Sequence, residues 1–180
     1  ALAGVSYTLG REGEETYGEK LNGVRTRLAE HHQFVVDVDP YRVPGDPSSG
    51  LLPGIQPGGP GREGAGDRRI QAYCYRICAT DVPANRIPWP RPRGYDPARY
   101  ELLLRNFEAG DHRIPWHPVR MPNGKTDSNN NHAFSTDHIG ANYDYPDGDY
   151  AARERIRADH ERYQKGLLWT LANHPRVPAK

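Results

Sequence analysis

Glycine and proline interrupt this chain so often that long regular elements are confined to a few stretches. Its 180 residues include 19 glycines and 17 prolines, about one residue in five, which approaches the level of low-complexity chains. The 11 tyrosines and 3 tryptophans argue against disorder, because they supply large side chains for burial. A chain of this length can form one domain with a core of its own. We therefore expect a folded, loop-rich protein.

Two stretches carry the signals of helices. The first covers about 96–109, with Asp96 as its N-cap, Pro97 at its first position and Gly110 after its end. The second covers about 149–173. Apolar side chains recur on one face of each at helical spacing: Tyr100, Leu103, Leu104 and Phe107 in the first, and Ala152, Ile156, Tyr163, Leu167 and Leu171 in the second.

Strands are expected at 31–38 and 69–80, and a short helix around 14–21. Both strand segments contain several β-branched or aromatic residues. The alternation of strands and helices that builds a parallel sheet is missing. The chain is therefore predicted to be an α+β protein with a small, mostly antiparallel sheet and two main helices.

Three side chains within 69–80 bear on chemistry. Arg76 stands among small, mostly apolar neighbours, so it is either paired with a carboxylate at a sheet edge or a clamp for an anion in a pocket. Cys74 and Cys78 would lie roughly 13 Å apart along a strand. That separation is too large for a disulfide with each other, and we interpret both as small buried thiols.

The charge and hydropathy of the chain argue against two classes of partner. With 24 basic and 23 acidic residues its net charge is +1, so no overall field favours nucleic acid. No apolar run approaches the roughly 18 residues that a membrane span needs. The chain begins at Ala1 without a recognisable signal peptide. The compartment stays open, with a secreted or periplasmic protein preferred to a cytoplasmic one.

The segment 44–67 is predicted to be a loop-rich insertion, because turn residues dominate it. Within it, residues 59–64 read Gly-Pro-Gly-Arg-Glu-Gly and satisfy the dinucleotide pattern G-x-G-x-x-G. That motif binds a pyrophosphate only between a hydrophobic strand and a helix. Prolines and glycines precede it here, and Ala-Gly-Asp-Arg-Arg follows. We interpret the match as coincidental.

Residues 121–146 form a long polar segment without helical or strand periodicity. Amide, carboxylate and basic side chains gather there around aromatic ones: Lys125, Asp127, Asn129, Asn130, Asn131, His132, Asp137 and His138 around Phe134, Tyr143 and Tyr145. A polar loop with its own apolar anchors is more often functional than accidental.

Three interpretations of this segment stay open. The first two are a calcium-binding loop and an irregular loop stabilised by its own asparagines. Asp127 begins a calcium-loop pattern, but His132 and His138 occupy the positions that require a glycine and an acidic residue. We therefore assign no metal site. Asparagines also stabilise irregular loops by capping their own backbone.

The third interpretation is the wall of a binding or catalytic site. A lysine can hold a negative charge, and amides can bond hydroxyl or carbonyl oxygens. Carboxylates and imidazoles can move protons. The candidates for these tasks are Lys125, Asn129 and Asn130 for binding, and Asp127, His132, Asp137 or His138 for proton transfer. The spacing alone does not choose among them.

Eight blocks of sequence, in order along nearly the whole chain, carry a family resemblance. They are 3–12, 17–23, 39–53, 69–78, 94–104, 122–130, 134–137 and 163–169. Among them are Gly94-Tyr-Asp-Pro-Ala-Arg-Tyr100 and Pro122-Asn-Gly-Lys-Thr-Asp-Ser-Asn-Asn130. In these blocks the chain resembles the FAD-dependent oxidoreductase family, some of whose members are labelled xanthan-lyase-like.

By this resemblance the chain corresponds to the interior, substrate-side or cap portion of a two-domain flavoprotein. Family members open with a strand, a G-x-G-x-x-G turn and a helix that hold the FAD pyrophosphate, and nothing here corresponds to them. The resemblance implies a single domain over 1–180, a fragment of a longer flavoprotein that is catalytically incomplete alone. It also implies FAD, held mainly by a region outside this chain. The implied partner is the rest of that flavoprotein or a second copy.

Under the hypothesis that the chain is this substrate-side portion, polar residues of the segments 69–80 and 121–146 are expected to line the substrate pocket. The expected substrate-binding residues are Arg76, Lys125, Asp127, Asn129 and Asn130, and the expected catalytic residues are Asp137 and His132. The latter would assist proton removal during hydride transfer from a small, hydroxyl-rich or carbohydrate-related substrate to flavin. The competing class is a non-enzymatic, secreted domain that binds glycans or self-assembles, with calcium as a stabiliser.

Overall fold

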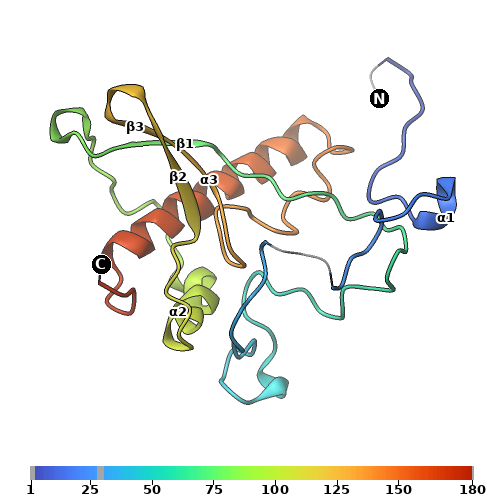
Figure 1. The fold of residues 1–180 in the computed structure, drawn as a ribbon, viewed down its shortest axis with the longest axis horizontal. Helices are drawn as coiled ribbons and strands as arrows, with labels where there is room; N and C mark the ends of the chain where they lie inside the picture. The colour runs from blue at the N-terminus through green and yellow to red at the C-terminus, as the bar shows by residue number, and fades with distance from the viewer. Residues whose placement is uncertain (1–2, 28–30, 180) are drawn as a thin grey trace.

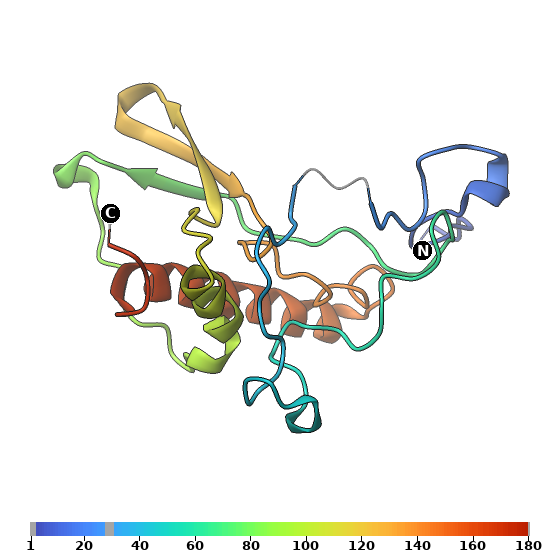
Figure 2. The ribbon, with the colours of Figure 1, turned by 60° about the horizontal axis from the view of Figure 1, so that its bottom comes forward.

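The structure is a computed structural model that describes residues 3–27 and 31–179. Its helices are α1 (Glu14–Tyr17), α2 (Glu101–Glu108) and α3 (Tyr150–Asn173), and its strands are β1 (Ile77–Thr80), β2 (Trp116–Met121) and β3 (Lys125–Asn130). Short 3-10 turns occupy Pro47–Ser49, Pro83–Asn85, Pro97–Tyr100 and Pro122–Gly124. The sheet and α2 lie toward the end of the molecule that holds the C-terminus, and α1 lies at the opposite end (Figures 1 and 2). The predicted loop-rich α+β fold is confirmed.

Both main helices begin where their caps predict. Asp96 accepts a hydrogen bond from the amide of Ala98 at 3.0 Å, and the turn Pro97–Tyr100 leads directly into α2. Asp149 accepts one from the amide of Ala152 at 2.7 Å at the start of α3. The two helices therefore follow from local sequence.

The sheet is antiparallel, with β3 between β1 and β2. Asp127 of β3 pairs with Cys78 on one side and Val119 on the other. The connection from β2 to β3 contains Asn123 and Gly124 with φ values of 64° and 65°. Two successive left-handed residues, typically Asn-Gly, match the twist of a tight hairpin.

Several predicted elements are wrong or shorter than expected. Residues 31–38 form no strand; Phe34 and Val35 are 41% and 63% exposed, and a β-prone segment needs a partner strand to pack against. The predicted strand 69–80 is regular only at its end, in β1. The predicted helix 14–21 stops after one turn, where Gly18 takes a left-handed φ of 68°.

Two further corrections concern the sheet. The polar residues Lys125–Asn130 form β3 rather than an irregular loop, because their backbone pairs on both sides. The prediction of two buried thiols is also wrong, since Cys74 is half-buried and Cys78 is exposed. Cys78 lies on an edge strand, where one face of the sheet meets solvent.

The core lies between α2, the turn before it and the C-terminal half of α3. Its buried members are Tyr100, Leu103, Leu104, Phe107, Tyr163 and Leu167. A β-carbon at position 166 would lie 2.0 Å from the hydroxyl oxygen of Tyr100. Gly166 thereby leaves room for the Tyr100 hydroxyl to donate to the Tyr163 carbonyl at 2.9 Å.

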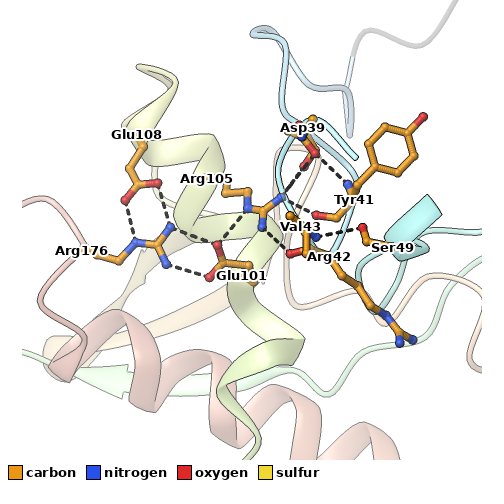
Figure 3. Close-up of polar contacts among 10 residues, drawn as sticks. Asp39, Tyr41, Arg42, Val43, Ser49, Glu101, Arg105, Glu108 and Arg176 are labelled. Carbon is orange, nitrogen blue, oxygen red and sulfur yellow. Dashed lines mark hydrogen bonds and ion pairs between the residues drawn. The ribbon is translucent and has the colours of Figure 1, made fainter. Parts of the chain in front are cut away.

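A second interaction network ties α2 to the loop 39–50 and to the C-terminal segment (Figure 3). Arg105 is only 11% exposed. It pairs with Glu101 at 2.9 Å and donates to backbone carbonyls of the loop, including Tyr41 at 2.6 Å. Arg176 pairs with Glu101 and Glu108, at 2.7 and 2.6 Å. The guanidinium of Arg105 therefore ties this loop to α2.

The protein exposes far more surface than its mass requires. Its accessible area is 12098 Å² at 20.3 kDa, whereas a compact monomer of that mass exposes roughly 8,800 Å². Large apolar side chains contribute along the whole chain: Val5, Tyr17, Leu21, Val35, Ile87 and Tyr150 are each at least 63% exposed. No helix in the described ranges is long and apolar enough to cross a bilayer.

Candidate functional site

A cavity of about 310 Å³ lies where α2, α3 and the segment 133–139 meet. We call it the His138 cavity. Its described lining residues are Phe34, Pro53, Gly54, Ile55, Arg99, Leu102, Ala133, Phe134, Ser135, Asp137, His138, Ile139 and Tyr163. Most of these are apolar, and the side chains with a charge or an imidazole are Arg99, Asp137 and His138. An apolar cavity with a few convergent polar groups is the usual form of a small-molecule site.

Asp159 of α3 organises the polar end of the cavity, although it is not itself a lining residue. Both oxygens of its carboxylate accept from the guanidinium of Arg99, each at 3.0 Å. One of them also lies 2.8 Å from Nε2 of His138. A bidentate arginine–carboxylate pair is geometrically specific, so it holds the imidazole at a defined place.

Packing fixes the imidazole of His138 from a second direction. Its ring stacks on Tyr163, with centroids 4.1 Å apart and planes within 5°. Its backbone amide donates to the carbonyl of Tyr73 at 3.2 Å. Tyr163 is itself held, because its hydroxyl donates to the carbonyl of Ser135 at 2.7 Å. The histidine is therefore pre-positioned, as a binding or catalytic group must be.

The environment makes His138 neutral. Burial lowers the pKa of His138 to about 4, Arg99 adds to that effect, and Asp159 opposes it. Burial alone would raise the pKa of Asp159, but bonds from Arg99 and His138 hold it well below its usual range. The site thus combines a neutral imidazole with a permanent ion pair at ordinary pH.

We assign the proton of the neutral ring to Nε2. A carboxylate only accepts, and an unprotonated Nε2 would turn its lone pair toward an oxygen of Asp159 at 2.8 Å. Nε2 also lies 2.9 Å from Nη2 of Arg99, which directs one of its two N–H groups to Asp159. Nδ1 is then a lone pair, and it bonds to none of the described residues. It can accept a hydrogen bond or a proton from a ligand.

The expected site residues divide between the cavity and the sheet. Asp137 lines the cavity, and its carboxylate accepts from the side-chain amide of Asn130. Asn129 accepts from the amide of Asn130 at 3.0 Å. His132 has a positive φ of 67° and is not among the lining residues. Burial lowers the pKa of His132.

The other expected binding residues lie on the sheet. Arg76 and Asp127 form an ion pair whose side chains are 56% and 42% exposed, which matches the carboxylate-paired alternative for this arginine. Lys125 is exposed at the start of β3. Their roles in substrate binding stay predictions.

Sequence reasoning missed Arg99 and Asp159. They stand 60 positions apart, and His138 stands 21 positions before Asp159. Each occurs in a segment whose pattern indicates a helix, where a charged residue normally faces solvent. No local spacing would have nominated them, because the cluster exists only after α3 packs beside the turn before α2.

Comparison with protein families decides the membership of the chain. The model of the family described as FAD dependent oxidoreductase matches residues 1–179. The chain belongs to the FAD-dependent oxidoreductase family. No curated protein and no solved structure matches it. Membership supports an oxidoreductase-related role and implies FAD as the cofactor of the family.

The glycine-rich segment of this family member does not form a dinucleotide cradle. Within the described ranges, no strand leads into residues 59–64 and no helix begins directly after them. Gly64 instead pairs with the backbone of Val24 at 2.9 Å, and a β-carbon at Gly64 would lie 2.6 Å from the carboxylate of Glu14. These glycines allow two segments of the chain to pack closely.

Metal ligands do not converge in the described part of this oxidoreductase-family chain. No group of three or more His, Cys, Asp or Glu side chains there could hold an ion. The polar side chains of the His138 cavity are groups for hydrogen bonding and proton transfer.

The stability of the protein should depend on pH through His138. The folded protein holds this ring neutral down to about pH 4, whereas the unfolded chain protonates it near its ordinary pKa of about 6.5. The unfolded state binds more protons in that interval, so stability falls as the pH drops from about 6.5 to about 4. The shift corresponds to at most about 3 kcal/mol.

We expect the H138F variant to lose less stability than the wild type between pH 7 and pH 4.5, by about 2 kcal/mol. Urea unfolding at the two pH values measures this. H112Q, which removes an exposed histidine, is the control and should behave like the wild type. Equal losses in H138F and wild type would show that the folded protein does not hold His138 neutral.

Proposed function

We propose that this chain is the substrate-side part of an FAD-dependent oxidoreductase, and that the His138 cavity receives the substrate. The reaction class is hydride transfer from a hydroxyl-bearing organic compound to flavin. The flavin is held mainly by a part of the protein other than the residues described here, because residues 59–64 form no cradle for it. The chain alone is then not a complete catalyst.

One observation carries the proposal: a neutral, pre-positioned imidazole lines a small, largely apolar cavity. With Nε2 hydrogen-bonded to Asp159, Nδ1 is the ring atom of His138 that remains as an acceptor for a ligand. Oxidation of an alcohol requires a group that accepts the hydroxyl proton. His138 is our candidate for that group, and Asp137, in the same cavity, is the candidate for holding a second hydroxyl.

The site residues that we expected from the sequence remain proposals of lower priority. Asn130 would orient Asp137, through the hydrogen bond between their side chains. Arg76, Lys125, Asp127 and Asn129 would act on parts of the substrate that extend toward the sheet. His132 remains a second candidate base.

The large exposed surface supports a partner. The excess of roughly 3,300 Å² over a compact monomer exceeds what one subunit contributes to a typical stable interface, roughly 800 Å². We propose that the rest of the flavoprotein covers much of it. The small core agrees with this, because a single core of a few buried residues is a weak basis for independent stability.

The test uses the complete flavoprotein, purified with its flavin and kept free of oxygen. A panel of alcohols, sugars and hydroxy acids is mixed with it while the visible absorbance of the flavin is followed. We expect at least one compound to bleach the flavin and H138F to slow the bleaching by about 10²-fold. This is the low end for a general base, because a pKa of about 4 lies well below neutral pH.

Two matched variants complete the test. H112Q should react like the wild type, and H132F should be slowed much less than H138F. A complete protein that contains no flavin, or that no member of the panel reduces, would contradict the proposal and favour a non-enzymatic binding domain. Equal rates in H138F and wild type would remove His138 from the reaction.

A further inference from the structure

We propose that the His138 cavity selects neutral substrates that have an apolar body and a hydroxyl group, and that it rejects carboxylates and phosphates of similar shape. This inference rests on the proposed function, because it names the substrate class of the same site. Three features of the cavity carry it: its charge, its hydrogen-bonding groups and its walls.

The charges at the polar end leave no free cation for an anionic ligand. Arg99 is the only arginine or lysine among the described lining residues, and Asp159 neutralises it through both oxygens. His138 is neutral above about pH 4. Arg162 approaches the far side of Asp159 at 3.5 Å, but its side chain is 54% exposed and water screens it. The carboxylate of Asp137 then gives the cavity a negative balance.

This end of the cavity offers two acceptors to the proton of a hydroxyl group. They are Nδ1 of His138, which carries the lone pair of the neutral ring, and the carboxylate of Asp137. Each Nη atom of Arg99 directs one hydrogen bond to Asp159, and the hydroxyl of Tyr163 donates to Ser135. A ligand hydroxyl can donate to either acceptor, whereas a carboxylate has no proton to donate.

The walls and the volume favour a compact, apolar ligand body. Phe34 and Ile139, which line the cavity, are 41% and 47% exposed, so they form an apolar rim. Ile55, Leu102 and Phe134 continue the apolar surface inward. At the roughly 30 Å³ that one water occupies in the liquid, 310 Å³ holds about ten non-hydrogen atoms. A monocyclic alcohol has this size.

Methyl NMR of isoleucines in the complete flavoprotein tests the selectivity without requiring turnover. Ile55 and Ile139 line the His138 cavity, and Ile114 lines a different cavity and serves as the internal control. Benzyl alcohol and benzoate are the matched probes. We expect benzyl alcohol to shift the two cavity methyls, but not Ile114, with a millimolar Kd. Benzoate should bind at least tenfold more weakly.

A variant without the carboxylate of Asp137 tests whether this charge causes the weaker binding of benzoate. D137N should bring benzoate to within a few fold of benzyl alcohol, whereas D144N, which removes an exposed carboxylate outside the cavity lining, should leave the ratio unchanged. Benzoate binding as tight as benzyl alcohol in the wild type would overturn the proposal. No shift by benzyl alcohol, or an unchanged ratio in D137N, would also overturn it.

The outcomes separate this inference from the proposed function. If a hydroxyl compound reduces the flavin while benzoate binds as well as benzyl alcohol, only the substrate class is wrong. If the protein holds no flavin, the enzymatic proposal is wrong, and the preference for neutral ligands is still measured by the methyl shifts.

Discussion

Replacement of Arg105 by methionine is expected to lower the free energy of unfolding by about 3 kcal/mol. The side chain is 11% exposed, and its guanidinium bonds to Glu101 and to the carbonyls of Asp39, Tyr41 and Arg42. Methionine preserves the length and apolar stem of arginine but donates no hydrogen bond. Several half-buried acceptors are then left without a donor, and Glu101 loses one of its two arginine partners.

Two further variants are compared with R105M, and urea unfolding measures the free energy of unfolding of each. R68M removes an arginine that is 83% exposed and lies 3.4 Å from Asp147; its effect should be below about 0.5 kcal/mol. R105K keeps the charge but has no planar fork, so we expect an intermediate loss. If R105M loses no more stability than R68M, Arg105 does not stabilise the protein by holding the loop 39–50 on α2.

Hydrogen exchange locates the damage. The loop 39–50 is closed by bonds from Arg42 to Gly50 at 2.9 Å and from Leu52 to Pro40 at 2.8 Å. These amides should exchange faster in R105M, because the guanidinium that holds the carbonyl side of the loop is gone. Amides in the middle of α3 should change only by the global loss of stability.

The helices could be predicted because their determinants are local. Asp96, Pro97 and Asp149 act within one turn of the helices that they begin, and the apolar stripes of these helices need no knowledge of the partner. The hairpin between β2 and β3 was also predictable, since Asn123-Gly124 is the strongest short-range hairpin signal. The hairpin was not predicted, because the polar residues after Asn123-Gly124 have the composition of a loop.

The strands and the site depend on contacts that sequence does not display. Residues 31–38 have strand-like composition but no partner among the described residues, whereas polar β3 is regular because it pairs on both sides. The cluster of Arg99, His138 and Asp159 is assembled by packing of α3 beside the turn before α2. Of these three residues, only His138 belongs to a segment whose composition indicated chemistry. Its place in the cluster depends on tertiary packing and not on its spacing in the sequence.

The largest effect on function should come from filling the His138 cavity. Ala133 lines it, and A133C can be introduced together with C74S and C78S, so that the new thiol is the only one contributed by this chain. Reaction with N-ethylmaleimide then places a bulky group in the cavity. We expect flavin reduction by the substrate to fall by at least about 10²-fold, because even small displacements of a reacting group have effects of that size.

The control places the same label elsewhere. Ala172 is exposed and lines the separate cavity near the C-terminus, so labelled A172C should react with the substrate at the unlabelled rate. Dithionite should reduce the flavin in all the labelled proteins. This separates a blocked substrate site from a lost or damaged flavin.

The rate of substrate-dependent flavin bleaching in labelled A133C is therefore the most direct measurement of whether the His138 cavity is the substrate site. If the substrate binds in this cavity, labelled A133C is inert toward it, while labelled A172C and unlabelled A133C are active. Bleaching at the same rate in labelled and unlabelled A133C would contradict this assignment and place the substrate elsewhere in the protein.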